Sequence, residues 1–189
     1  MTPPIVLASA SPRRKQLLGY IVDSFTQISA DIDETPLLNE TPKQLVSRLA
    51  TSKAQFIQNT HADSVVIGSD TVVAIDEKIL GKPLNYNDFL AMMATLSGSV
   101  HNVYTGVSIL YKDTCLSETI VTKVIMSEIT KIEAQNYWAT NEPQDKAGGY
   151  AIQGIGGQFV KSIEGSFSAV VGLPIHETKY LLTKILKDT

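Results

Sequence analysis

Residues 5–15 of the chain read Ile5-Val6-Leu7-Ala8-Ser9-Ala10-Ser11-Pro12-Arg13-Arg14-Lys15. A short apolar run gives way to small hydroxyl residues, then to proline, and then to three cations. Serine is a favoured N-cap and proline a favoured first helical residue, so the stretch predicts a buried strand, a turn and a helix that begins at Ser11-Pro12. The three cations oppose the helix dipole at that end, which predicts an anionic ligand such as a phosphate chain.

Composition limits the class of protein. The chain has 189 residues, of which 43% are hydrophobic and 19% charged, as expected for one soluble globular domain spanning residues 1–189. A net charge of −3 argues against a general nucleic-acid or membrane-surface binder. The first residues lack a signal-peptide pattern and no apolar run is long enough for a bilayer, so we expect a cytoplasmic protein. Cys115 is the one cysteine, which excludes an intramolecular disulfide and a cysteine zinc cage.

Hydrophobic periodicity predicts alternating strands and helices. Strands are expected over residues 5–8, 25–29, 64–67 and 71–75, and a hairpin over 103–111 and 119–129. Helices are expected over residues 12–18, from 41–42 to about 54, over 85–96 and 133–140, and from 174 onward. Gly68-Ser69-Asp70 is expected to break one strand at its functional end. Alternating elements with a long hairpin indicate an α/β fold with a mixed sheet.

Residues 145–172 are rich in glycine, yet aromatic and branched apolar residues are interleaved with the glycines. A flexible linker would lack such apolar anchors. The pattern is typical of a packed, sharply turning wall of a site.

Two acidic features could carry chemistry. Asp31, Asp33 and Glu34 form a loop that either lies exposed in solvent or helps to hold magnesium, which takes one or two carboxylates together with substrate phosphates. Asp70, at the expected strand break, could deprotonate a water or hold a metal; an Asx turn is the alternative.

Two lysines are candidates for phosphate binding. Lys82 lies between glycine and proline in a tight turn, and Lys53 lies on a helix face; ordinary surface positions are the alternative for both. The three histidines show no metal-binding spacing, and no serine-hydrolase elbow occurs. Tyr137 and Trp138 fit a core better than a base-stacking platform.

The order of the motifs is more specific than any one of them. The matching segments are Leu7-Ala8-Ser9-Ala10-Ser11-Pro12-Arg13-Arg14, Asp33-Glu34, Ser52-Lys53-Ala54, Gly68-Ser69-Asp70-Thr71, Leu80-Gly81-Lys82-Pro83, Leu96-Ser97-Gly98, residues 145–154 and residues 165–174. In this order they resemble the Maf family of nucleoside triphosphate pyrophosphatases, from residue 7 to about residue 178.

The resemblance implies a fold and a reaction. The fold is a mixed, elongated sheet flanked by helices, with two lobes around a central nucleotide cleft. Water attacks between the α- and β-phosphates of a nucleotide, which gives the monophosphate and pyrophosphate, with Mg²⁺ or Mn²⁺ as cofactor. The family is associated with removal of unwanted nucleotides and with arrest of cell division at septum formation.

The resemblance is closer to the dTTP/UTP branch than to the 7-methyl-GTP branch, because this chain carries Arg13, Thr71, Gln153 and the segment 145–148. Modified pyrimidine nucleotides are further expected substrates. The amide of Gln153 suits the O4 and N3–H edge of uracil or thymine, with Thr71 as a fixed neighbour.

The resemblance also implies roles for the other residues. Ser9, Arg13 and Arg14 would bind the phosphate chain, and Lys53 and Lys82 would act as catalytic cations.

The expected carboxylate roles overlap. Asp70 would accept a proton from the attacking water, and Glu34 together with Asp70 would hold the metal. Asp31 is an additional carboxylate with no counterpart in the family motif.

Two rival functions stay open on the sequence alone. The chain could be a nucleotide-binding regulator of septum formation that does not hydrolyse, or a sugar-phosphate enzyme. We expect a nucleoside triphosphate as partner, and neither nucleic acid nor membrane. The edges of the hairpin would allow a homodimer.

Overall fold

The computed structural model describes residues 3–187, which divide into two compact units. Of the described residues, unit 1 comprises 3–70, 105–120 and 172–187, and unit 2 comprises 71–104 and 121–171. No helix within residues 3–187 combines the length and apolar character needed to cross a membrane.

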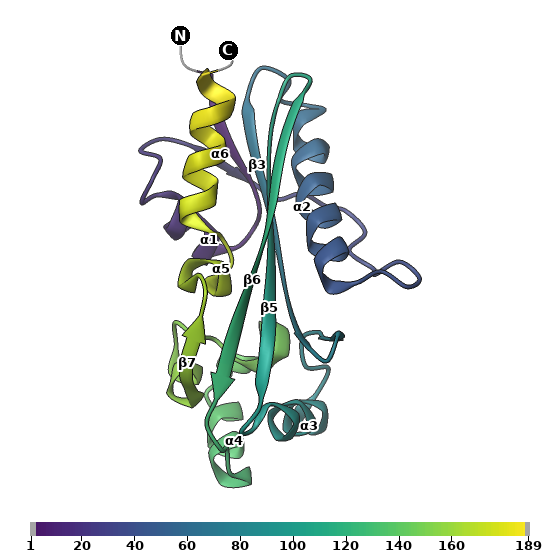
Figure 1. The fold of residues 1–189 in the computed structure, drawn as a ribbon, viewed down its shortest axis with the longest axis vertical. Coiled ribbons are helices and arrows are strands. Elements are labelled where there is room, and N and C mark those ends of the chain that lie inside the picture. Colours follow the sequence, from purple (N-terminus) through teal and green to yellow (C-terminus); the bar gives the residue numbers. More distant parts are fainter. Residues whose placement is uncertain (1–2, 188–189) are drawn as a thin grey trace. The chain divides into compact units, whose positions relative to one another are not determined.

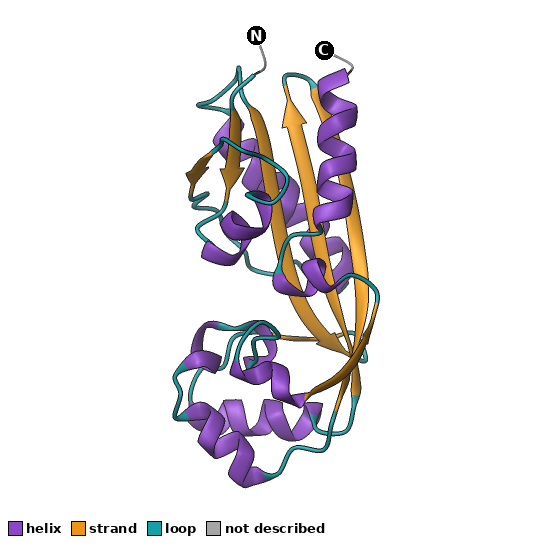
Figure 2. Ribbon diagram, turned by 90° about the vertical axis from the view of Figure 1, so that its left-hand side faces the viewer, coloured by secondary structure: helices purple, strands orange, loops and turns teal. Residues whose placement is uncertain are grey.

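Unit 1 begins as the sequence predicts. β1 (Ile5–Ala8) is followed by α1 (Pro12–Leu18), whose N-cap is Ser11 and whose C-cap is Gly19. β2 (Thr26–Ile28) and β3 (Val65–Ile75) both pair with β1 in parallel. α2 (Pro42–Gln58) and α6 (Ile175–Lys187) lie on opposite faces of this part of the sheet (Figures 1 and 2).

The sheet is mixed, which confirms the predicted α/β class. Within the described residues, its seven strands follow the order β2-β1-β3-β5-β6-β7, with β4 (Lys78–Leu80) on β3. β5 (Val100–Tyr111) and β6 (Thr114–Met126) are neighbours joined by a two-residue turn. β3 with β4 and β6 with β7 (Val160–Glu164) are antiparallel. The predicted hairpin is confirmed, but its second strand begins five residues earlier than expected, and β4 and β7 were not predicted.

The predicted strand break at residues 68–70 is wrong, because β3 is continuous through them. Gly68 lies so close to α2 that an added Cβ would be 2.1 Å from the carbonyl oxygen of Ala50. The hydroxyl of Ser69 donates to the carbonyl oxygens of Gly106 (2.8 Å) and Gly172 (3.0 Å). These partners come from distant parts of the chain, and they keep three residues with turn-like character in an extended strand.

Unit 2 holds α3 (Tyr86–Leu96), α4 (Lys131–Trp138) and α5 (Phe167–Val171), together with three 3₁₀ segments. These segments are η1 (Glu142–Asp145), η2 (Ala147–Gly149) and η3 (Ile155–Phe159). The glycine-rich stretch therefore folds into tight turns around apolar anchors, as predicted.

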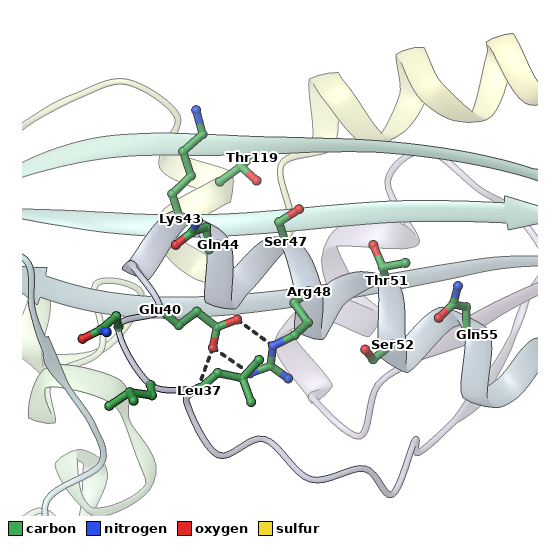
Figure 3. A pocket seen from close by; sticks show the side chains of 12 residues that line it. Leu37, Glu40, Lys43, Gln44, Ser47, Arg48, Thr51, Ser52, Gln55 and Thr119 are labelled. Atoms are coloured by element: carbon green, nitrogen blue, oxygen red, sulfur yellow. Dashed lines mark hydrogen bonds and ion pairs between the residues drawn. The ribbon is translucent and has the colours of Figure 1, made fainter.

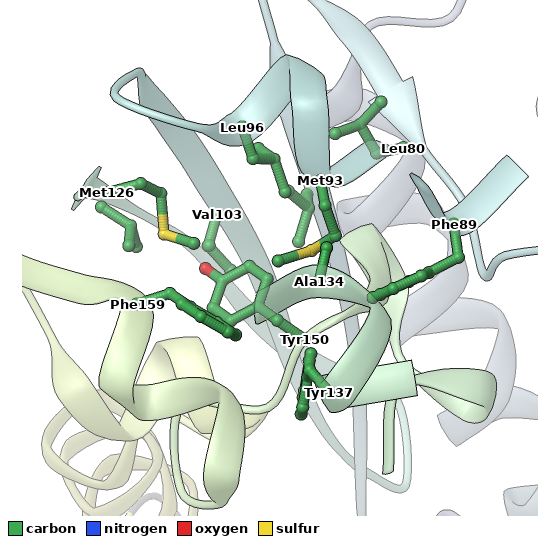
Figure 4. Close-up of a cluster of buried hydrophobic side chains, with 12 residues drawn as sticks. Leu80, Phe89, Met93, Leu96, Val103, Met126, Ala134, Tyr137, Tyr150 and Phe159 are labelled. Carbon is green, nitrogen blue, oxygen red and sulfur yellow. The ribbon is translucent and has the colours of Figure 1, made fainter. Parts of the chain in front are cut away.

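Each unit has a hydrophobic core of its own. In unit 2, Phe89, Met93, Tyr137 and Phe159 belong to a cluster of buried side chains between the helices and the strands (Figure 4). Tyr137 is 1% exposed, so its predicted place in the core is confirmed. In unit 1, a smaller cluster joins β1, β3 and β5 to α2, with the members Val6, Ala8, Ala54, Ile57, Val66 and Leu110.

Gly68 on β3 and Gly106 on β5 set how closely α2 packs on the sheet in unit 1. An added Cβ at Gly106 would be 2.3 Å from the carbonyl oxygen of Val46, so Gly106→Ala must push α2 away from β5. We expect the free energy of unfolding to fall by about 1–3 kcal/mol in denaturant titrations. Gly81→Ala is the control, since nothing lies within 4 Å of an added Cβ there. Equal stability of the two variants would contradict this account of the packing.

Candidate active site

The turn after β1 is fixed by its own side chains. Ser9 is buried, and its hydroxyl oxygen accepts from the backbone N–H of Ser11 (3.2 Å) and from Nη1 of Arg14 (3.3 Å). Nε2 of Gln27 donates to the carbonyl oxygens of Ser9 (2.8 Å) and Ser11 (3.1 Å). Gln27 was not identified from the sequence, because an amide in a short strand carries no signal of this contact.

Arg14 points into unit 1. Its Nε donates to the carbonyl oxygen of Gly172 at 2.8 Å, the same oxygen that accepts from Ser69. Burial lowers the pKa of Arg14, and the nearby carboxylates of Asp70 and Glu34 oppose that lowering. Arg13 is half-buried, and its side chain makes no hydrogen bond or ion pair within residues 3–187, so its guanidinium stays available for a ligand.

α1 has only seven residues. A helix of two turns sums few peptide dipoles. The argument for an anionic ligand therefore rests on the arginine side chains and not on the helix dipole.

Three predicted residues meet at one ammonium group. Nζ of Lys53, on α2, lies 2.6 Å from Oδ1 of Asp70, on β3, and 2.8 Å from Oε1 of Glu34, in the acidic loop. Lys53 and Asp70 are each 6% exposed, whereas the Glu34 side chain is 55% exposed. The site thus joins a buried ion pair to a carboxylate that faces solvent.

The buried position changes the acidity of Asp70. Burial raises its pKa above the usual range of a carboxyl, while the positive charges of Lys53 and Arg14 oppose that rise. A carboxylate with a raised pKa holds a proton more readily, which suits a group that takes one from water. Asp70 lies inside a continuous strand, so the Asx-turn alternative is wrong.

The acidic loop is anchored to α2 by residues that were not identified from the sequence. Nε and Nη2 of Arg48 donate to the two carboxylate oxygens of Glu40 at 2.6 and 2.8 Å. Nη2 of Arg48 also donates to the carbonyl oxygen of Thr35 (3.1 Å). These bonds hold the segment that carries Glu34, while Asp31 is exposed.

A hollow of about 800 Å³ lies along α2 beside this anchor (Figure 3). Residues 37–40 and one face of α2 line it, together with Thr119. Arg48 and Glu40 are among its lining residues and form an ion pair, so each charge already has a partner. None of the predicted site residues lines the hollow, so it is distinct from the candidate active site.

Three predicted site residues belong to unit 2. Thr71 follows Asp70 directly on β3 and is half-buried. Lys82 is exposed in the turn after β4, where the N–H of Gly148 donates to the carbonyl oxygen of Gly81 (2.9 Å). Gln153 is exposed, and its side chain makes no hydrogen bond within residues 3–187. Their participation in one site with the residues of unit 1 stays a prediction.

The buried histidine is structural. Nε2 of His101 lies 2.7 Å from the hydroxyl of Tyr150, and burial lowers the pKa of His101 to about 4. Within residues 3–187 no three histidine, cysteine or acidic side chains gather as a metal site. Metal binding in the described part of the chain would depend on one or two carboxylates, a number that Mg²⁺ accepts when phosphates complete its shell.

Comparisons with known proteins agree with the resemblance noted in the sequence. The Maf-like protein family matches residues 4–185. The chain is 50% identical over 185 residues to the dTTP/UTP pyrophosphatase of Pseudoalteromonas atlantica (strain T6c / ATCC BAA-1087), which covers 96% of both chains. It is 44% identical over 183 residues to the dTTP/UTP pyrophosphatase of Vibrio parahaemolyticus serotype O3:K6, which covers 96% of this chain and 97% of the relative.

The structure of the Staphylococcus aureus Ham1 protein aligns with a TM-score of 0.46 and 15% identity, over 68% of this chain and 72% of that chain. The family match, by contrast, spans nearly the whole sequence, and the relatives align at almost full length. The chain therefore belongs to the Maf family.

Proposed function

We propose that this chain is a nucleoside triphosphate pyrophosphatase that hydrolyses dTTP and UTP to the monophosphate and pyrophosphate. The observation that carries the proposal is the meeting of Lys53, Asp70 and Glu34 in unit 1, beside the inward-pointing Arg14. The relatives at 44–50% identity are named dTTP/UTP pyrophosphatases, which supports the same reaction. Removal of unwanted or modified pyrimidine nucleotides is the role that fits this activity.

We assign phosphate binding to arginine and lysine side chains. Arg14 contacts the fixed hydroxyl of Ser9. We assign Arg13, in the same helix, and Lys82 to phosphate binding on the strength of the family resemblance. Transfer to water at a phosphate is mostly a matter of positioning and of neutralising charge, so these side chains supply the main requirement.

We assign the role of proton acceptor to Asp70. Its carboxylate is buried, its pKa is raised by that burial, and its Oδ1 accepts from Lys53. We assign it the proton of the attacking water. Lys53 keeps the carboxylate ionised and in place until that proton arrives.

The carboxylates also fit a divalent cation. Glu34 and Asp70 converge on a single positive charge, which is the donor set that Mg²⁺ or Mn²⁺ uses together with water and phosphate oxygens. Such a cation would neutralise charge on the phosphates. A carboxylate bound tightly to a cation is a weak base, so Glu34 is the principal ligand in this proposal and Asp70 the second.

We assign recognition of the nucleobase to Gln153 and Thr71. The Gln153 amide is exposed and has no hydrogen-bond partner within residues 3–187, so both its donor and its acceptor are available to a pyrimidine. A non-hydrolysing regulator of septum formation is not favoured, because the relatives are named as enzymes. A cytoplasmic location, a homodimer and the absence of nucleic-acid and membrane partners remain part of the proposal.

A nucleotide panel tests the function. Pyrophosphate release is measured for UTP, dTTP, CTP, GTP and ATP, with Mg²⁺, with Mn²⁺ and with a chelator. We expect fastest release from UTP and dTTP and loss of activity with the chelator. Full activity in chelator would remove the metal from the proposal, and equal rates on all five nucleotides would remove the pyrimidine preference.

Asp70→Asn tests the proton acceptor. The amide keeps the size of the side chain but cannot take a proton from water, so kcat for UTP should fall by about 10²- to 10⁴-fold. Asp31→Asn is the matched control, because Asp31 is an exposed carboxylate of the same unit. Circular dichroism checks that both variants are folded. A folded Asp70→Asn variant that turns over UTP as fast as Asp31→Asn would rule out the assignment.

The ion pair predicts a pH effect. The positive charge of Lys53 lowers the pKa of Asp70, so Lys53→Met should raise that pKa. Asp70 accepts a proton only when ionised, and the acid limb of kcat/KM against pH should therefore move to higher pH. Lys43→Met, an exposed lysine on the same helix, should leave the limb in place. An unmoved limb in Lys53→Met, or one at lower pH, would contradict the role of Asp70.

A further inference from the structure

We infer that Glu142 and Tyr137 are positioning residues that hold the turn carrying Gln153 in the conformation that reads the base. The inference rests on the proposed function, in which Gln153 contacts the pyrimidine. It concerns residues of unit 2 only.

The turn is held on both sides of Gln153. On the N-terminal side, the backbone N–H of Ala151 donates to the hydroxyl of Tyr137 (3.1 Å). On the C-terminal side, the N–H groups of Ile155 (3.0 Å) and Gly156 (2.9 Å) donate to the two carboxylate oxygens of Glu142. Gln153 lies between these attachment points, so its backbone has little freedom.

The two holding side chains are themselves joined. The hydroxyl of Tyr137 donates to Oε1 of Glu142 at 2.7 Å. Burial alone would raise the pKa of Glu142, but the hydrogen bonds from Gly156, Tyr137 and Ile155 outweigh it and the pKa is lowered. The group is therefore a carboxylate at neutral pH, and its hydrogen bonds are charge-assisted and correspondingly strong.

Glycines allow the carboxylate and the hydroxyl to approach the turn. An added Cβ at Gly154 would be 2.2 Å from Oε2 of Glu142, and one at Gly156 would be 2.4 Å from the hydroxyl of Tyr137. The glycines on either side of residue 155 thus serve this contact. The glycine-rich wall predicted from the sequence gains a specific purpose at these two positions.

The attachment leads back to the core of unit 2. The Tyr137 ring is 1% exposed and packs against Phe159 (5.4 Å between ring centroids) and Phe89 (6.1 Å). An aromatic ring packed in this way cannot follow a moving turn. The hydroxyl of Tyr137 is therefore a fixed point from which the turn is built.

This rigidity matters because of the chemistry of the amide. Uracil presents an acceptor and a donor where cytosine presents the reverse, and a side-chain amide can rotate to satisfy either. Discrimination needs an amide that cannot turn at low cost, since a site rejects an analogue when its own polar groups would be left unpaired. Fixing the backbone on both sides of Gln153 sets the position and direction from which its amide meets the base. The rotation of the amide itself is left to its neighbours in the proposed site, of which Thr71 is one.

The test compares UTP with CTP. In Glu142→Gln, one carboxylate oxygen becomes an N–H₂ group, so at least one of the two backbone donors loses its acceptor. We expect the ratio of kcat/KM for UTP over CTP to fall by about 10-fold, the scale of one charge-assisted hydrogen bond. Amide hydrogen exchange at Ile155 and Gly156 should become faster. Gln144→Ala is the control, since Gln144 is exposed in the same 3₁₀ segment and its side chain bonds only to Asn141 within residues 3–187.

A double-mutant cycle separates positioning from general destabilisation. If Glu142 acts through Gln153, Glu142→Gln should leave the UTP/CTP ratio unchanged in a Gln153→Ala background. Additive effects on the ratio would overturn the inference. Tyr137→Phe, which keeps the ring and removes the hydroxyl, serves as the second variant should Glu142→Gln fail to fold, and the same fall in ratio is expected.

The outcomes also separate a failure of this positioning role from a failure of the proposed recognition of the pyrimidine by Gln153. Wild-type enzyme that prefers UTP while Glu142→Gln and Tyr137→Phe keep the same ratio would overturn the positioning role alone. Wild-type enzyme without preference for UTP over CTP would overturn the role of Gln153 and the inference together.

Discussion

A carboxylate buried in a sheet needs a cation close by, and in unit 1 the burial of Asp70 depends on Lys53. Removing a charge from water costs several kcal/mol unless it is paired and hydrogen-bonded. The 2.6 Å contact supplies that partner, and Arg14 adds a second positive charge nearby. For Lys53 to reach β3, α2 must lie directly on the sheet, which the two glycines on β3 and β5 permit. The close packing of α2 on the sheet and the pairing of Lys53 with Asp70 therefore depend on each other.

Such a pair is a poor way to gain stability. A buried ion pair often contributes no more than the apolar residues that could replace it, so its presence points to a use. Here the buried pair is open on one side to Glu34, which is more than half exposed. The site therefore has a buried carboxylate, Asp70, and a solvent-exposed one, Glu34. This arrangement suits a site that a charged polyphosphate must enter and in which one water must lose a proton.

Much of unit 1 could be predicted because its signals are local. Ser11 and Pro12 begin α1, Thr41 and Pro42 begin α2, and in both helices the N-cap hydroxyl accepts the backbone N–H that the capping rules assign to it. The break expected at residues 68–70 was wrong because the hydroxyl of Ser69 finds acceptors 37 and 103 residues away. No local pattern contains those partners.

The site divides in the same way. The local pattern around Ser9 indicated a phosphate site and Asp70 was a candidate, whereas the role of Lys53 came from the family resemblance. Only folding shows that an ammonium on α2 meets carboxylates from two other elements. Gln27, Arg48 and Glu142 were missed, because each acts through backbone groups of a distant segment. The roles of Thr71, Lys82 and Gln153 came from the family resemblance and remain predictions. Hydrogen bonds between residues close in the sequence can be predicted from it. Hydrogen bonds from a side chain to the backbone of a distant segment cannot.

The central claim is that the residues around Lys53 direct water to the bond between the α- and β-phosphates. The most direct measurement is product analysis of UTP hydrolysis in ¹⁸O-labelled water by ³¹P NMR and mass spectrometry. The account predicts UMP and pyrophosphate in equal amounts, with one labelled oxygen per turnover. UDP with inorganic phosphate, or UTP recovered intact from folded enzyme with Mg²⁺ or Mn²⁺ present, would contradict it.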